Sequence, residues 1–590
     1  MWPLYCFDCK GNAPTDFKAH HFHVAVCRRF CFPLLGSAFE AGTCASVGRF
    51  MRAITKLHPG RTCKRGDFMN LLTTPWLTVL RQDGSEDVIA ANAITSGSPP
   101  VDLLAVRPDF RGALYQFLIG LLQTAYAPAD QDEWRERWRQ PPDLAALKAA
   151  FAPYVDAFEL VGKGPAFMQD FDLPEAEQTE VAALLIDAPG GKTVRDNLDH
   201  FVHRGVVEAL CPACASTALF TLQINAPSGG VGHRVSVRGG GPLTTLLLPA
   251  DPAATLWQKL WLNVMPADAL AYPPVKQRGD VLPWTVSTRT SDARGVGDTT
   301  PESVHALQAY WSMPRRIRLD WSEAEGACCD LCGAASDTLV RHYRTRNYGT
   351  NYTGAWLHPL TPYSLDPKGA NPPLSIKGQR GGVGYRHWLG LVLGNDDHQP
   401  DAAQAVRHFQ ARVRMPGVRL WCFGYDMDNM KARCWYDATL PVHAVAPEQQ
   451  PGLAAAVKAW LDVAKEAADL LHKWVRAAWF ERPGDAGLAP AVPQSFWQQS
   501  EPTFYTLLDQ VAKVDVYDES ALAPLHRDWL RASHGLALRL FDDWVLAAPI
   551  EGMNIERVVI ARSNLIKGLN TAKPMKQLWQ IVNTYEKEVA

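Results

Sequence analysis

The stretch "LAAAVKAWLDVAKEAADLLHKWVRAAW", residues 453–479, decides the architecture of the C-terminal part of the chain. Its apolar residues recur at alternating steps of four and three, so they share one face of an α-helix. The residues on that face are Val457, Leu461, Ala464, Ala468, Leu471, Val475 and Ala478. Because a helix with one apolar face needs other helices to cover it, the stretch predicts one seam of a helical bundle.

Three more helical stretches follow. One spans 494–512, and a second begins at Ser520 with Pro524 in its first turn, where proline costs little. A third runs from Ile555 to about Val582, with a break or bend expected at Pro574. Together they predict an antiparallel four-helix bundle over 446–590. The last stretch carries cations that form either a solvated face or a contact with a nucleic-acid backbone or an acidic partner: Arg557, Arg562, Lys567, Lys573 and Lys576.

The chain before the bundle has a different pattern of predicted secondary structure. Residues 69–445 mix short strand-like runs with helices, interrupted by glycine and proline. The predicted fold class is therefore α+β, with a large mixed α/β domain at 69–445 and a bundle at 446–590. Residues 1–68 hold a cluster of cysteines without a common zinc-finger spacing, and "MNLLTTPWL" at 69 begins like a domain. We expect 1–68 to be a start-site artefact or a disordered extension, with an N-terminal zinc module as the alternative.

Composition limits the possible classes of function. The 590 residues are 47% hydrophobic and 20% charged, which is ordinary usage for a folded multidomain protein. The formal charge of -2 means that any contact with nucleic acid must come from a local patch. The longest apolar stretch, 113–127, is shorter than the roughly 20 residues of a membrane-spanning helix and reads as a buried helix. No secretory signal is apparent, so we expect a cytoplasmic protein without a membrane partner.

Two CxxC pairs carry the clearest chemical signal. "CPAC" at 211–214 and "CCDLC" at 328–332 supply Cys211, Cys214, Cys329 and Cys332, with Cys328 as a spare candidate. Four thiolates form the closed, tetrahedral kind of zinc site, which is structural because no position remains open for water. The long spacer predicts a zinc ion that clips two distant loops together. The alternative is that both pairs are free thiols.

Three further segments suit contact with a ligand. A glycine-rich segment at 226–245 contains His233, Arg234 and Arg238, and glycine lets a backbone approach a ligand closely. The segment 343–362 interleaves basic and aromatic residues, which suits sugar and phosphate. The segment "WCFGYDMDNMKARCWYD" at 421–437 predicts a hairpin with a projecting polar tip. The plain alternatives are a long mobile loop and a hairpin packed on a neighbouring domain.

The sequence shows no catalytic constellation. It has no HExxH or GxSxG motif, and His358 is expected to be structural. Asp426 and Asp428 stand beside Lys431 and Arg433, which compete for their charge. We therefore expect a protein that is not an enzyme, with a zinc-containing nuclease or a purely structural scaffold subunit as the alternatives.

Several motifs occur in a recognisable order. They are "MNLLTTPWL" at 69, "NLDHFVHRG" at 197, "EALCPAC" at 208, "RGGGPLTT" at 238, "YRTRNYG" at 343, "HPLTPY" at 358 and "GYDMDNMKARCWY" at 424. In this series the chain resembles the CasA-type large subunit of Cascade, the type I-E CRISPR surveillance complex, over 69–590. The extension 1–68 has no counterpart in the family pattern.

The resemblance implies a non-catalytic subunit that recognises the protospacer-adjacent motif of double-stranded DNA from the minor groove. Such a subunit starts strand separation for R-loop formation and helps recruit the helicase-nuclease effector. The implied partners are the backbone, small-subunit and handle-binding proteins of Cascade, the CRISPR RNA and the double-stranded target DNA. The expected cofactor, a structural zinc ion, comes from the two CxxC pairs and not from the resemblance.

The resemblance also implies three DNA-binding elements. The glycine loop falls on Ser228, Gly229, Gly230, Val231 and Gly232, and the basic finger falls on Arg346 or Asn347. The wedge falls on Asp428, Asn429, Met430 and Lys431, where this chain has "DNM" in place of the glutamine-centred tip of the best-known form. An amide at Asn429 suits the minor groove, whose edges offer acceptors and the guanine amino donor. Met427 and Met430 suit insertion between base steps, while Lys431 and Arg433 suit the adjacent phosphates.

Overall fold

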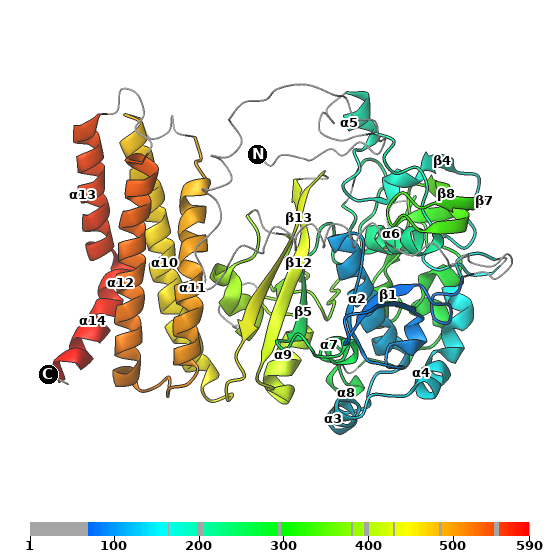
Figure 1. Cartoon of the computed structure of the whole chain (residues 1–590), viewed down its shortest axis with the longest axis horizontal. Helices are drawn as coiled ribbons and strands as arrows, with labels where there is room; N and C mark the ends of the chain where they lie inside the picture. Colours follow the sequence, from blue (N-terminus) through cyan, green and yellow to red (C-terminus); the bar gives the residue numbers. More distant parts are fainter. Residues whose placement is uncertain are drawn as a thin grey trace. The chain divides into compact units, whose positions relative to one another are not determined.

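The computed structural model describes residues 69–588 in segments. The residues between those limits that it does not describe are 163, 197–203, 228, 271, 293–296, 379–380, 395–400, 429–430, 483–486 and 548–553. The expectation for 1–68 therefore lies outside the described residues. Figure 1 shows a mixed helix and sheet region followed by a C-terminal group of long helices. This arrangement confirms the predicted fold class, α+β with a helical C-terminal region.

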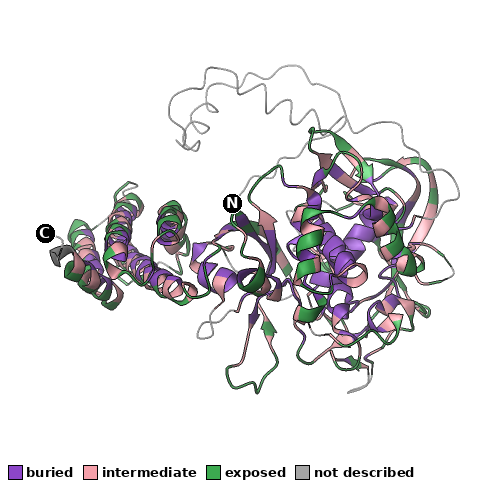
Figure 2. Ribbon diagram, turned by 90° about the horizontal axis from the view of Figure 1, so that it is seen from below, coloured by how far each residue is buried: buried purple, intermediate pink, exposed green. Residues whose placement is uncertain are grey.

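A buried helix, α2 (Pro108–Ala125), lies in the core of the mixed region. It is apolar on nearly every side, which explains why the sequence shows a long apolar run without helical periodicity. Its ring of Phe117 makes edge-on contacts with Phe220 of α6 (Pro212–Asn225) and with Trp311. Figure 2 shows helices in the interior of the mixed region that are largely buried. The sequence places this helix at 113–127, slightly late, because its first turn is polar.

Three small antiparallel sheets build the rest of the mixed region, in the orders β2-β1-β3, β13-β12-β5 and β4-β8-β7. The first contains β1 (Leu77–Arg81), β2 (Glu86–Ile89) and β3 (Pro100–Leu103). The second contains β5 (Thr244–Pro249), β12 (Val418–Asp428) and β13 (Lys431–Val442). The third contains β4 (Glu177–Glu180), β7 (Arg316–Cys328) and β8 (Ala335–Arg346).

Shorter elements connect these sheets. The helices are α3 (Gln131–Arg139), α4 (Leu144–Phe151), α5 (Gly191–Arg195), α7 (Leu256–Trp261), α8 (Ala267–Leu270) and α9 (Gln404–His408). The strands are β6 (Asp298–Thr299), β9 (Asn351–Tyr352), β10 (Tyr363–Ser364) and β11 (Leu374–Ser375). Among the described residues, no helix is both long and apolar enough to cross a bilayer.

The C-terminal helices are α10 (Gln450–Trp479), α11 (Ala491–Val511), α12 (Glu519–Val545), α13 (Ile555–Thr571) and α14 (Lys573–Glu588). The predicted seam of α10 is buried except at Leu461, which is half-buried. The last predicted helix is divided at Ala572, and Pro574 lies in the first turn of α14, where its missing N–H costs little. The predicted domain boundary at 445/446 falls in the connection between β13 and α10.

Candidate nucleic-acid interface and cysteine cluster

The four predicted cysteine ligands come together from two elements. Cys211 directly precedes α6 and Cys214 lies in its first turn, while Cys329 and Cys332 lie in the turn between β7 and β8. Their sulfur atoms all lie within 4.8 Å of one another, and the Sγ atoms of Cys211 and Cys332 are 3.7 Å apart. Cys328 ends β7 and is exposed, so it stays outside the cluster. Two cysteine pairs that lie more than a hundred residues apart in the sequence therefore form one cluster.

Hydrogen bonds that involve backbone groups hold the two elements of the cluster together. The carboxylate of Asp330, between the paired cysteines, accepts hydrogen bonds from the backbone N–H groups of Glu208 and Ala209, both at 2.7 Å. Leu210 and Val340 exchange two backbone hydrogen bonds, so the residue before Cys211 is paired with β8. These bonds fix the start of α6 against the β7–β8 hairpin.

The cluster fits a zinc ion in spacing and in chemistry. Zn–S bonds of about 2.3 Å place the sulfurs of a tetrahedral site about 3.8 Å apart, close to the observed 3.7 Å separation. Hydrogen bonds among the four thiols lower the pKa of Cys329 and Cys332 and raise the pKa of Cys211 and Cys214. Two of the four sulfurs are thereby biased toward the thiolate form that binds metal. Within the described residues, these cysteines are the one group of His, Cys, Asp and Glu side chains close enough to share an ion.

The glycine-rich segment 229–241 begins with the described residues of the predicted glycine loop, 229–232, and contacts the finger segment. The backbone N–H of Tyr348 donates to the carbonyl of Gly232 at 2.8 Å. A Cβ atom at Gly232 would overlap Asn347 and Tyr348, and the φ of 76° at Gly232 also favours glycine. Val231, between Gly230 and Gly232, is 72% exposed. The loop therefore presents an exposed tip directly beside the predicted finger.

The two finger candidates are exposed at the end of β8. Arg346 is the last residue of the strand, and its guanidinium donates to the carbonyl of Glu175 at 3.4 Å. Asn347 follows it, and its side chain hydrogen-bonds to His233 of the segment 229–241. Tyr343, by contrast, faces the core. The alternation of basic and aromatic residues in this segment thus reflects the two faces of a half-buried strand.

Most of the basic residues near the glycine loop serve the fold. Arg238 is fully buried, and its guanidinium donates to the hydroxyls of Thr244 and Thr361 at 3.0 and 3.2 Å. Arg234 donates to the hydroxyl of Ser291 at 2.8 Å. Arg315 lies under the loop and donates to the carbonyl of Pro227. Burial lowers the pKa of Arg238 to about 10. Arg234 and Arg238, noted from the sequence as basic residues of this segment, are therefore internal anchors.

The predicted hairpin is present as β12 and β13, paired from Val418↔Val442 to Asp428↔Lys431. Near its tip, Arg433 forms a two-pronged salt bridge with Asp426, with Nη2–Oδ1 and Nε–Oδ2 distances of 2.6 and 3.2 Å. The same guanidinium lies 3.5 Å from Asp428. The expected competition for these carboxylates therefore occurs, and Arg433 is less available to a phosphate than the sequence suggests. Lys431 is exposed.

The hairpin is anchored to α2 close to its tip. The phenol of Tyr425 on β12 donates to the carboxylate of Asp109, and Arg107 holds the other oxygen of that carboxylate at 3.0 Å. Asp109 and Tyr425 are both buried. Burial raises the pKa of Tyr425, so the phenol stays protonated and donates. This buried, charge-assisted contact fixes the strand three residues before the tip.

The segment 229–241 also contacts the hairpin. A Cβ atom at Gly241 would overlap the side chain of Met427, so the backbone at Gly241 packs directly against β12. The segment 229–241 therefore contacts the finger at Gly232, within the predicted glycine loop, and the hairpin at Gly241, beyond that loop. Of the residues assigned to DNA binding from the sequence, Ser228, Asn429 and Met430 lie outside the described residues.

Comparison with known proteins identifies the family. The model of the family described as CRISPR-associated protein Cse1 (CRISPR_cse1) matches residues 70–540, most of the chain. The chain belongs to the Cse1 family. This agrees with the resemblance to CasA-type subunits, which carry the alternative name Cse1 in the solved structures.

Solved Cse1 structures share the fold. Thermus thermophilus CasA (Cse1) is 17% identical with a TM-score of 0.62, and the match covers 88% of this chain and 100% of that one. Thermobifida fusca Cse1 is 19% identical with a TM-score of 0.65, covering 87% and 98%. A chain from a structure titled CRISPR RNA-guided surveillance complex is 18% identical with a TM-score of 0.59, covering 86% and 100%.

Sequence reasoning missed several residues that position these Cse1 elements. Nothing in the sequence links Asp109 to Tyr425, because 316 positions separate them. The role of Asp330 could have been noticed in the sequence, because this acidic residue stands between the two candidate metal ligands Cys329 and Cys332. The position of Arg315 under the loop could not be predicted, because a buried arginine and an exposed one look alike in a sequence.

Proposed function

We propose that this Cse1-family protein is the non-catalytic large subunit of a type I-E CRISPR RNA-guided surveillance complex and recognises the protospacer-adjacent motif in double-stranded DNA. Its partners are the backbone, small-subunit and handle-binding proteins, the CRISPR RNA, the target DNA and the helicase-nuclease effector. The observation that supports this most is the glycine-rich segment 229–241, which contacts the finger at Gly232 and the hairpin at Gly241. Three elements with different chemistry are thereby presented together.

The chemistry of the first two elements suits the minor groove. That groove offers acceptors at A·T pairs and adds the amino donor of guanine at G·C pairs. The exposed amide of Asn347 can donate or accept, and burial lowers the pKa of the His233 imidazole bonded to it, which keeps that ring neutral near pH 7. The exposed backbone around Gly230 can approach base edges closely. Arg346 adds a cation for the narrow groove or its phosphates.

The hairpin suits the separation of strands. An apolar wedge between base steps costs a few kcal/mol of unstacking, which new contacts offset. Such a wedge must be rigid, and the Asp109–Tyr425 contact and the salt bridge between Arg433 and Asp426 both stiffen the strands behind the tip. Lys431, exposed at the first position of β13, is placed for a phosphate.

A zinc ion at the cysteine cluster would act as a structural clip. It would be held by Cys211, Cys214, Cys329 and Cys332, and four thiolates leave no open coordination position. The far end of α6 leads into the glycine loop, and the far end of β8 leads into the finger. By fixing the start of α6 against the start of β8, the clip holds the two elements that present the loop and the finger.

Binding of motif-bearing duplexes by the reconstituted complex tests the proposal. We expect Asn347→Ala to weaken binding by about ten-fold and to relax the preference among motif variants, because one groove contact contributes about 1–3 kcal/mol. Arg341→Ala is the matched control, since Arg341 is exposed on the same strand. Binding that is independent of the motif would favour a purely structural scaffold. Metal-dependent DNA cleavage by the isolated chain would favour a zinc-containing nuclease.

A further inference from the structure

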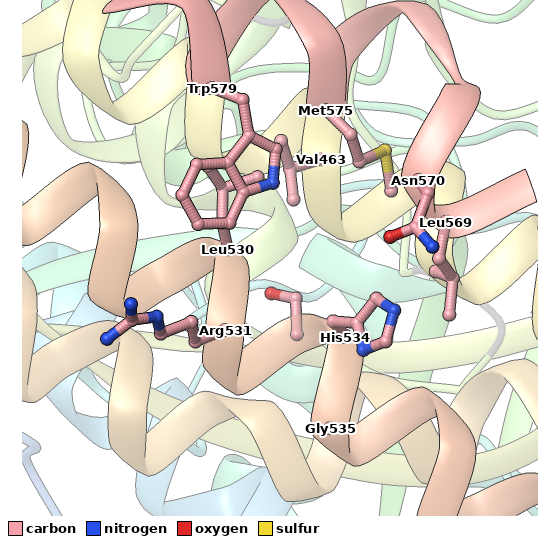
Figure 3. A pocket seen from close by; sticks show the side chains of 10 residues that line it. Val463, Leu530, Arg531, His534, Gly535, Leu569, Asn570, Met575 and Trp579 are labelled. Atoms are coloured by element: carbon pink, nitrogen blue, oxygen red, sulfur yellow. The ribbon is translucent and has the colours of Figure 1, made fainter. Parts of the chain in front are cut away.

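The C-terminal helices enclose a pocket of about 260 Å³, lined by residues of α10, α12, α13 and α14. The interruption at Ala572 creates it, because the chain changes direction there and brings Asn570 from α13 together with Met575 and Trp579 from α14. Figure 3 shows Trp579 and Met575 on one side of the pocket and His534 on the other. The volume lies just below the range of about 300–1,000 Å³ for drug-sized ligands, so it suits a single small ring system.

One polar group in the pocket has no partner. Ser533 is one of the residues that line the cavity, it is 2% exposed, and its buried Oγ makes no hydrogen bond within the described part of the chain. A buried polar group is normally hydrogen-bonded, and leaving one unpaired is destabilising. The Ser533 hydroxyl therefore points to a missing hydrogen-bonding partner in this cavity.

The remaining lining combines hydrogen-bonding groups with apolar surface. His534 hydrogen-bonds to the side chain of Asn570, and burial lowers the pKa of His534, so the ring is neutral near pH 7. Asn570 is exposed and carries both a donor and an acceptor. Trp579 and Met575 supply an aromatic face and a thioether. An apolar side chain from a partner protein would leave the Ser533 hydroxyl unsatisfied, whereas a heteroaromatic ring with polar edges would satisfy it.

The surroundings of the pocket are mainly basic. Arg531 lies on the lining and is exposed, and it forms no salt bridge with any residue that the structure describes. The stretch 563–585 contains Lys567, Lys573 and Lys576 and no acidic residue. Near the lining residue Val463, helix α10 carries two acidic residues, Asp462 and Glu466. Asp462 forms a salt bridge with Lys458 at 2.8 Å. The rim thus suits a ligand that carries phosphate.

We propose that this pocket binds one unstacked nucleobase of single-stranded nucleic acid, with its ring against Trp579 and its polar edge at Ser533, His534 and Asn570. The inference rests on the proposed strand-opening function, which supplies unpaired bases. Stacking on an aromatic side chain tolerates any base, because every base has a π-face. The pocket would thus hold an opened strand without reading its sequence.

Single-stranded probes test the pocket in the full chain. The probes are a short fluorescein-labelled oligothymidylate and the same oligomer with abasic sites, compared by fluorescence anisotropy. We expect the wild-type protein to bind the abasic oligomer about ten-fold more weakly, as the loss of one base stack predicts. Equal affinity for the two oligomers would overturn the proposal, because binding would then come from phosphate contacts alone.

Substitutions in the pocket complete the test. Ser533→Ala should weaken oligothymidylate binding about five-fold, the effect of losing one hydrogen bond. The same substitution should leave the thermal midpoint unchanged or raise it, because the hydroxyl is unsatisfied in the free protein. Asn570→Ala should also weaken binding, and Asn583→Ala, at an exposed position of α14 outside the lining, is its control.

If Ser533→Ala and Asn570→Ala both preserve the affinity ratio between the two oligomers, the nucleobase site is refuted. These probes contain no duplex and no motif. Their result is therefore independent of motif recognition, and either function can fail while the other stands.

Discussion

Replacing Tyr425 by phenylalanine removes the contact that ties the hairpin to α2 while keeping the aromatic ring. The phenol donates to Asp109, and both residues are buried, at 3% and 2% exposure. A hydrogen bond to a charged group contributes about 1.5–3 kcal/mol, so we expect the free energy of unfolding to fall by that amount. We also expect slower strand opening of motif-bearing duplexes by the assembled complex, because β12 is freed three residues before its tip.

Tyr115→Phe is the matched control for this prediction. Tyr115 is a buried tyrosine of α2 whose phenol donates to the carboxylate of Asp102 at 2.8 Å, so its loss should destabilise the fold to a similar degree. Its phenol does not hold the hairpin. Urea unfolding measures the stability of both variants, and a fluorescent base analogue beside the motif reports strand opening. Equal slowing of strand opening in the two variants would refute the anchoring role of Tyr425.

Three further predictions concern the zinc clip, the bundle and the hairpin. The double substitution Cys211→Ser with Cys332→Ser should abolish zinc in metal analysis of the purified chain. It should also lower the free energy of unfolding by about 4 kcal/mol, the entropy of closing so long a loop. Unchanged zinc content would contradict the assignment. Burial lowers the pKa of His526 to about 4, below the unfolded value of about 6.5, so the unfolded state binds more protons as pH falls. Chemical denaturation should therefore show about 2 kcal/mol less stability at pH 4.5 than at pH 7 from this residue, a difference that His526→Gln should remove. Lys431→Ala should weaken duplex binding equally for all motifs and reduce the salt slope by about one; a motif-selective loss would exclude a phosphate contact.

Regular patterns in the sequence predicted the elements that depend on local order. The steps of four and three in 453–479 predicted the buried face of α10, because a helix repeats its faces with that period. The apolar run, the short Asp/Asn-rich interruption and the second apolar-aromatic run at 421–437 predicted β12 and β13. The CxxC spacing likewise grouped four cysteines that the structure brings together.

Contacts between distant residues were beyond the sequence. Arg238 lies among glycines, a composition typical of a ligand-binding loop, yet its guanidinium fills a buried site between Thr244 and Thr361. Arg433 was a candidate for a phosphate contact, but the hairpin brings its guanidinium onto the carboxylate of Asp426. The pocket at Ser533 arises where α13 and α14 meet, and helical periodicity within each segment carries no information about that junction.

The recognition of the motif by a wedge at the hairpin tip is tested most directly by the double substitution Asn429→Ala with Met430→Ala. The measurement is the affinity of the assembled complex for a matched motif-bearing duplex and for the same target with a pre-opened bubble. We expect binding to the duplex to weaken by about 1–3 kcal/mol, the value of one groove contact. Binding to the bubble should change far less, because its unstacking cost has been removed in advance. An equal loss on duplex and bubble would contradict the wedge.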